Sequence, residues 1–151
     1  MDRRPQRLAA VVFDFDGTLA HLNIDFKEMR RDVLRLASSH GIAEDGMEGL
    51  FVLELIAEIR ERIGRSAPEL GSAFSEQALR LVTDRELAGA AGSRLFPGVK
   101  EMFGEFRRRG TKTGILTRNC LEALTAVFPD IGEHCDTVVT RDDTPRVKPH
   151  P

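Results

Sequence analysis

Residues 11–20 read VVFDFDGTLA, an apolar run that ends in two aspartates, Asp14 and Asp16, followed by Gly-Thr. The continuous apolar run from Leu8 to Phe13 predicts a strand that is covered on both faces in a parallel sheet. Two carboxylates this close repel each other, and burying either one without a partner is costly. Either both lie in a solvated turn, or a positively charged group is held between them.

Two further stretches have the character of strands, residues 112–117 and 136–140. Between them, apolar residues fall on one helical face, and Asn119 with Glu122 has the spacing of a capping box, so we expect a helix to begin at Asn119 and run to Phe128. Another helix is expected over residues 97–110, ended by a glycine. Strand, helix and strand in this order form a βαβ unit. The sequence therefore predicts an α/β fold with a Rossmann-like parallel sheet core.

The interval between Asp16 and Lys112 is much longer than a crossover needs, which is about a dozen residues. Its apolar residues recur at helical spacing over three stretches, and no strand pattern competes there. We therefore predict an α-helical insertion in a sheet core. The expected domains are a catalytic core from residues 1–18 and 95–151 and a helical cap over residues 19–94.

Composition narrows the class of protein. The chain has 151 residues, with 22 basic and 24 acidic side chains and a net charge of −2, so nothing global favours nucleic acid or an acidic membrane surface as a partner. No apolar stretch is long enough to span a bilayer, and the apolar stretch near the start is too short for a signal peptide. Two cysteines make neither a disulfide framework nor a zinc set. We expect a cytoplasmic protein.

Polar side chains collect where the predicted strands end. Asp14 and Asp16 follow the first strand, Thr117, Arg118 and Asn119 follow the second, and Lys148 comes after the third. In an open parallel sheet, ligands bind beyond the carboxyl ends of the strands. An insertion placed directly after Thr18 would lie over that same edge.

These motifs identify a family. The stretch DFDGTL at residues 14–19 after an apolar strand, Thr117 at the end of a second strand and Lys148-Pro149 after a third together resemble the haloacid dehalogenase-like (HAD) superfamily. The helical insertion between the first two motifs resembles its helical-cap branch, which includes phosphoglycolate phosphatases. The resemblance covers nearly the whole chain.

The resemblance implies a magnesium-dependent phosphatase that acts on a small phosphorylated metabolite. Asp14 would be the nucleophile that forms an aspartyl-phosphate, with Mg²⁺ held by the Asp14 carboxylate and the backbone carbonyl of Asp16 and bridging to a phosphate oxygen. Asp16 would also exchange protons with the leaving group and with water. Thr117 and Lys148 would offset charge on the transferring group. The residues expected to shape the turn or bind phosphate are Gly17, Thr18, Arg118 and Asn119.

One part of the family pattern has no counterpart in this sequence. The fourth motif of these phosphatases, an acidic pair after a further strand, would have to follow Lys148. We expect Asp142 and Asp143 to act in a turn rather than to replace that pair. The sequence thus favours the N-terminal portion of a longer protein, with the sheet leaving a long apolar edge beside the first strand exposed.

Other interpretations remain open at this point. A phosphomutase of the same branch would use both aspartates in the same way, and a non-catalytic protein would keep only the fold. A lone Asp-x-Asp-Gly stretch is also compatible with a solvated turn, Lys148 with an ordinary surface lysine, and Asn119 with a helix cap. The sequence defines neither the phosphate ester nor the oligomeric state.

Overall fold

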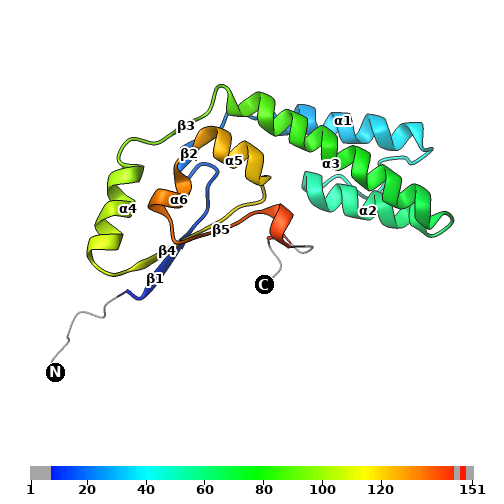
Figure 1. The fold of residues 1–151 in the computed structure, drawn as a ribbon. Coiled ribbons are helices and arrows are strands. Elements are labelled where there is room, and N and C mark those ends of the chain that lie inside the picture. Colours follow the sequence, from blue (N-terminus) through cyan, green and yellow to red (C-terminus); the bar gives the residue numbers. More distant parts are fainter. Residues whose placement is uncertain (1–7, 145–146, 149–151) are drawn as a thin grey trace. The chain divides into compact units, whose positions relative to one another are not determined.

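The computed structural model describes residues 8–144 and 147–148. The chain divides into two compact units, one formed by Met1–Asn23 with Gly89–Pro151 and the other by Ile24–Ala88. The first unit contains the parallel sheet and its helices, and the second contains three helices (Figure 1). Within the described residues, no helix combines the length and the apolar character that crossing a membrane requires.

The first unit is built on a three-stranded parallel sheet in the order β1-β4-β5. Its strands are β1 (Ala10–Phe13), β4 (Lys112–Leu116) and β5 (Thr137–Val139). In the register, Phe13 lies opposite Ile115, and Ile115 lies opposite Val138. These three strands confirm the predicted α/β fold and its parallel pairing.

Three helices follow in the same unit, α4 (Val99–Arg108), α5 (Leu121–Val127) and the short α6 (Ile131–His134). Their apolar residues join the sheet residues in one core, with Phe103, Leu124 and Phe128 fully or almost fully buried. Gly110 has a positive φ of 70° just after α4, as expected of a residue that ends a helix.

The prediction that the first strand is covered on both faces was wrong. Phe13 packs into the core, but Val12 on the opposite face is 65% exposed. The reason is that the core built by α4, α5 and α6 lies on the face of Phe13 and Ile115, opposite to Val12. Separately, β1 is an edge strand of the described sheet, as the sequence led us to expect.

The prediction of no strand between Asp16 and Lys112 was also wrong. A two-residue strand β2 (Ala20–His21) pairs antiparallel with β3 (Arg94–Leu95), so that Ala20 lies opposite Leu95. The pairing joins the two chain segments that lead into and out of the helical unit. Strands of two residues are too short to leave an alternating pattern in the sequence, which explains why this pair was missed.

The second unit consists of α1 (Phe26–Ser39), α2 (Val52–Gly64) and α3 (Pro68–Ala90). The three predicted helical stretches are confirmed. Their inward faces form one core in which Val33, Ile59 and Phe74 are fully buried. Each helix thus hides its apolar stripe against the other two, as amphipathic helices require.

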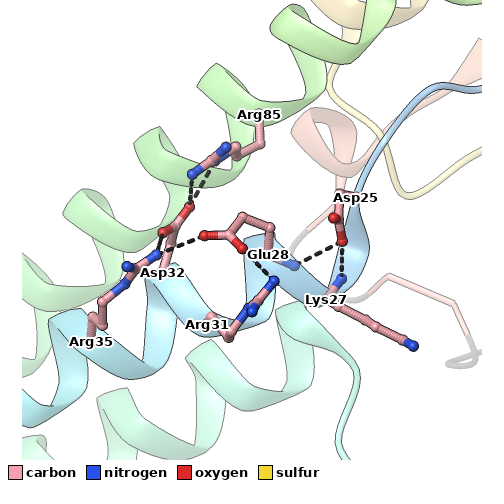
Figure 2. Close-up of polar contacts among 7 residues, drawn as sticks. All are labelled: Asp25, Lys27, Glu28, Arg31, Asp32, Arg35 and Arg85. Atoms are coloured by element: carbon pink, nitrogen blue, oxygen red, sulfur yellow. Dashed lines mark hydrogen bonds and ion pairs between the residues drawn. The ribbon is translucent and has the colours of Figure 1, made fainter.

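Charged side chains connect the helices of this unit (Figure 2). Asp32 of α1 accepts a hydrogen bond of 2.7 Å from Arg85 Nε of α3 and is also paired with Arg35. Burial works to raise the pKa of Asp32, but the hydrogen bonds from Arg85 and Arg35 outweigh it and leave the pKa below its usual value. Asp25 caps α1 by accepting the backbone N–H groups of Lys27 and Glu28. The network fixes the start of α1 and its packing on α3.

Asp136 performs a similar function between two strands of the first unit. Its Oδ1 accepts from Lys112 Nζ at 2.7 Å, and its Oδ2 accepts from the backbone N–H of Thr113 at 2.9 Å. The hydrogen bond from Lys112 and then that from Thr113 lower the pKa of Asp136 to about 2. The ionised carboxylate therefore ties the start of β4 to the residue that precedes β5.

This pairing predicts a specific pH dependence of stability. Because the folded-state pKa of Asp136 is depressed from 3.8 to about 2, its contribution is present above the unfolded-state value and is lost as pH falls through that interval. The variant Asp136→Asn lacks this contribution, so we expect it to be less stable than the wild type at neutral pH. Urea unfolding of both proteins from about pH 6 to about pH 2.5 should show the difference shrinking below about pH 4. A difference that stays constant would contradict the assignment.

Candidate active site

The carboxyl ends of β1 and β4 form one edge of the sheet. Asp14 directly follows the last residue of β1, and Thr117 directly follows the last residue of β4. Because these two strands are parallel neighbours, both side chains start from the same edge. The segment after β5 reaches the same edge, since the Thr117 N–H donates to the carbonyl of Val139 at 3.0 Å.

An ion pair joins Asp14 to Lys148. The Lys148 Nζ donates to Asp14 Oδ1 at 2.7 Å, although 134 residues separate the two in the sequence. The same oxygen accepts the backbone N–H of Phe15 at 2.8 Å, which fixes the direction of the carboxylate. The Asp14 side chain is 50% exposed and that of Lys148 is 30% exposed, so the pair lies where a ligand from solvent can reach it.

A tight turn carries the second aspartate. The carbonyl of Phe15 accepts N–H groups from Thr18, Leu19 and Ala20, and Gly17 donates its N–H to the carbonyl of Ala20. Gly17 has a φ of 72°, a conformation that side chains with a Cβ rarely adopt. Phe15 and Leu19 are buried and anchor the turn, which leaves Gly17 and Thr18 exposed at its tip.

Asn119 links the turn to the end of β4. Its Nδ2 donates to Asp16 Oδ1 at 2.7 Å, and its backbone N–H donates to the Thr117 hydroxyl oxygen at 3.1 Å. Thr117 and Asn119 are both buried. The structure therefore brings Asp16, Thr117 and Asn119 into one hydrogen-bonded chain.

The expected helix start at Asn119 was wrong. The helix α5 begins at Leu121, and its N-cap is Cys120, whose Sγ accepts the N–H of Ala123 at 3.4 Å. The asparagine amide is directed to Asp16 instead of capping the helix. A sequence pattern records the spacing of a cap but not a competing acceptor from a distant loop, which is why the capping box was misassigned.

The loop after β5 supports the loop after β4. Arg141 donates its backbone N–H to the carbonyl of Asn119 at 3.2 Å and its Nη1 to the carbonyl of Arg118 at 3.3 Å. The Arg141 side chain is only 7% exposed. The sequence motifs assign this arginine no function, and its burial has no signal in the sequence.

Asp142 and Asp143 act in the turn. Asp142 Oδ2 accepts the N–H of Leu121 at 2.8 Å. Asp143 Oδ2 accepts the N–H of Thr140 at 2.7 Å and the Thr140 hydroxyl at 2.8 Å, and these bonds, the backbone one first, lower the pKa of Asp143. Both carboxylates are thus used by neighbouring backbone and hydroxyl groups, as expected of turn residues.

The donor set suits a magnesium ion. Magnesium in proteins is bound by one or two carboxylates, and water and substrate phosphate oxygens complete its octahedron. The Asp14 carboxylate, which is accessible to solvent, and the backbone carbonyl of Asp16 provide hard oxygen donors at one turn, and the Asp16 carboxyl group stays available for proton transfer. Among residues 8–144 and 147–148, no three or more His, Cys, Asp or Glu side chains gather into a metal cluster. The residues present thus fit an ion held by Asp14 and Asp16 that takes its other ligands from water and substrate.

Comparison with known proteins defines the class. Residues 8–151 match the haloacid dehalogenase-like hydrolase family, which is nearly the whole chain. The chain therefore belongs to the haloacid dehalogenase-like hydrolases, and its parallel sheet with a helical insertion is the fold of this family.

Three known proteins are similar to this chain in sequence or in fold. A haloacid dehalogenase-like hydrolase domain-containing protein of Arabidopsis thaliana is 30% identical over 118 residues, which cover 78% of this chain and 44% of the relative. A phosphoglycolate phosphatase of Rhodobacter capsulatus is 27% identical over 157 residues, covering 94% of this chain and 66% of the relative. The crystal structure of CbbY from Rhodobacter sphaeroides in complex with phosphate has a TM-score of 0.50 at 25% identity, with 94% of this chain and 67% of that chain covered. The chain thus spans about half to two thirds of the length of these relatives.

The turn at Gly17 gives a prediction on stability. A Cβ at Gly17 meets no atom within 4 Å, so the cost of Gly17→Ala is one of backbone conformation alone. We expect the free energy of unfolding to fall by about 1–2 kcal/mol, the usual cost of a left-handed conformation. The same substitution at Gly104, inside α4 and 3.9 Å from Arg108 Nη1, should raise it by about 0.5–1 kcal/mol. Urea unfolding checks both, and equal effects at the two glycines would contradict the turn geometry.

Proposed function

We propose that this chain carries the catalytic machinery of a magnesium-dependent phosphatase that hydrolyses a small phosphomonoester through an aspartyl-phosphate on Asp14. The observation that carries the proposal is the 2.7 Å contact between Lys148 Nζ and Asp14 Oδ1 at the carboxyl edge of the sheet. Membership of a hydrolase family and similarity to a phosphoglycolate phosphatase support it. The activity of a whole protein of the relatives' length is part of the same proposal.

In the first step, a carboxylate oxygen of Asp14 attacks the phosphorus of the ester. The bond between phosphorus and the ester oxygen breaks, and the leaving oxygen takes a proton from the Asp16 carboxyl group. The products are the free alcohol and a phosphoryl group bound to Asp14. The hydrogen bond from Phe15 N–H to Asp14 Oδ1 keeps the nucleophile directed, which favours attack by the other oxygen.

In the second step, water regenerates the carboxylate. Asp16, now ionised, takes a proton from a water molecule, whose oxygen attacks the phosphorus of the aspartyl-phosphate. Inorganic phosphate leaves, and Asp14 returns to its starting form. One carboxyl group thus acts first as an acid and then as a base, which requires that its position be fixed throughout.

The remaining residues of the site offset the negative charge of the phosphoryl group. Lys148 offers a positive charge to the phosphoryl oxygens as charge moves onto them, and Thr117 offers its hydroxyl. Arg118 and the tip of the turn at Gly17 and Thr18 lie at the same edge and are proposed to contact the phosphate. A magnesium ion bound through Asp14 and Asp16 would reduce the repulsion between the carboxylate and a dianionic ester.

The ligand class follows from this chemistry. A site with one nucleophilic carboxylate and one lysine is suited to a phosphate monoester, and the structurally similar CbbY was crystallised with phosphate. The proposal does not extend to a particular alcohol.

The decisive variants alter the ion pair. With an aryl phosphate and Mg²⁺, Asp14→Asn should reduce turnover to background because it removes the nucleophile. Lys148→Met should lower kcat by about 10²–10³-fold, the usual effect of losing one charge-stabilising donor. Lys100→Met breaks another lysine–aspartate ion pair, that with Asp130 at 2.5 Å, elsewhere in the same unit and should leave kcat within about twofold. Steady-state kinetics with and without EDTA measure all three.

Several results would contradict the proposal. Turnover that survives Asp14→Asn, or that is unchanged in EDTA, would exclude the mechanism or its metal. Activity that requires a bisphosphate activator and releases no phosphate would favour a phosphomutase. A well-folded wild type with no turnover above Asp14→Asn would favour a non-catalytic protein.

A further inference from the structure

Asn119 lies where three loops meet. Its side chain donates to Asp16 after β1, its backbone N–H donates to Thr117 after β4, and its carbonyl accepts from Arg141 after β5. Asn119 is only 4% exposed. Asn119 belongs to the loop after β4 and is hydrogen-bonded to the loops after β1 and β5. Because it is also shielded from solvent, its position is fixed relative to all three loops.

The contact between the amide and Asp16 has a chemical consequence. An asparagine Nδ2 can only donate, so Asp16 Oδ1 must offer it a lone pair. A carboxyl group accepts best through its unprotonated oxygen, so this contact favours Oδ2 as the oxygen that carries the acidic proton. The amide thus restrains the rotation of the Asp16 carboxyl group.

We propose that Asn119 is a positioning residue that orients Asp16 for proton transfer. The inference rests on the proposed function, in which Asp16 protonates the leaving oxygen and later deprotonates water. It assigns to the buried amide a role through Asp16 rather than a direct contact with phosphate. The distinction matters because the two roles change different kinetic constants.

Kinetics of two variants test the role. Asn119→Ala removes the donor and should lower kcat about tenfold or more, part of the roughly 10²–10⁴-fold that a general acid and base supplies, with KM changed less than about twofold. Asn119→Asp places a second carboxylate beside Asp16. Because like charges favour the protonated form, the pH profile of kcat should move to higher pH. A purely structural role would lower kcat without moving the profile.

Asp142→Ala is the matched control. It removes the hydrogen bond from Leu121 N–H and so loosens the same pair of loops, but it leaves the contact between Asn119 and Asp16 in place. Its kcat and pH profile should stay close to those of the wild type. A raised KM with an unchanged kcat in Asn119→Ala would overturn the inference in favour of phosphate binding, and so would an unmoved profile in Asn119→Asp.

A second measurement does not depend on turnover. Asn23 and Asn119 are the two asparagines of the chain, so their side-chain amide signals can be assigned by NMR. Asp16→Ala should shift the Asn119 amide protons strongly, whereas Asp142→Ala should shift them little. Unmoved protons in Asp16→Ala would overturn the inference even in an active enzyme. A shift in a chain that lacks turnover would instead overturn the proposed function, and with it the catalytic role, while leaving the contact itself established.

Discussion

The ion pair between Asp14 and Lys148 brings one of the last described residues to the end of the first strand. Asp14 is exposed and Lys148 is partly exposed, and ion pairs that solvent can reach contribute little to stability. Its importance is therefore chemical. A carboxylate by itself repels a phosphate dianion, and a lysine that already contacts that carboxylate can offset the charge of the approaching ester. The parallel pairing of β1 and of β5 with β4 makes this arrangement possible, because it places the segments after β1 and after β5 on one edge of the sheet.

Around this pair, the site is held by hydrogen bonds between loops rather than by the strands themselves. The turn at Gly17 is closed on the carbonyl of Phe15, and Arg141 holds the segment of Arg118 and Asn119 from the side of β5. Asn119 connects this segment to the turn at Gly17 by its contact with Asp16. A single buried amide thus fixes the group that must both give and take a proton.

Much of this arrangement could be predicted from the sequence, because strong local patterns encode it. The apolar run before Asp14 and the strand before Thr117 gave the sheet, and three helical patterns gave the insertion. The features that could not be predicted depend on distant partners. The pairing of β2 with β3 uses backbone groups alone, and the amide of Asn119 was assigned to a helix cap because its acceptor lies 103 residues away. The exposure of Val12 depends on which elements cover that face of the sheet, which no periodicity within β1 records.

The central claim is that Asp14 itself receives the phosphoryl group. Rapid acid quenching of the wild-type protein during turnover of an aryl phosphate, followed by peptide mass spectrometry, tests this claim most directly. The account predicts one added phosphoryl group on the peptide that contains Asp14, labile to hydroxylamine and absent without substrate. A phosphoryl group on another residue, or ongoing turnover with no modified peptide at any quench time, would contradict it.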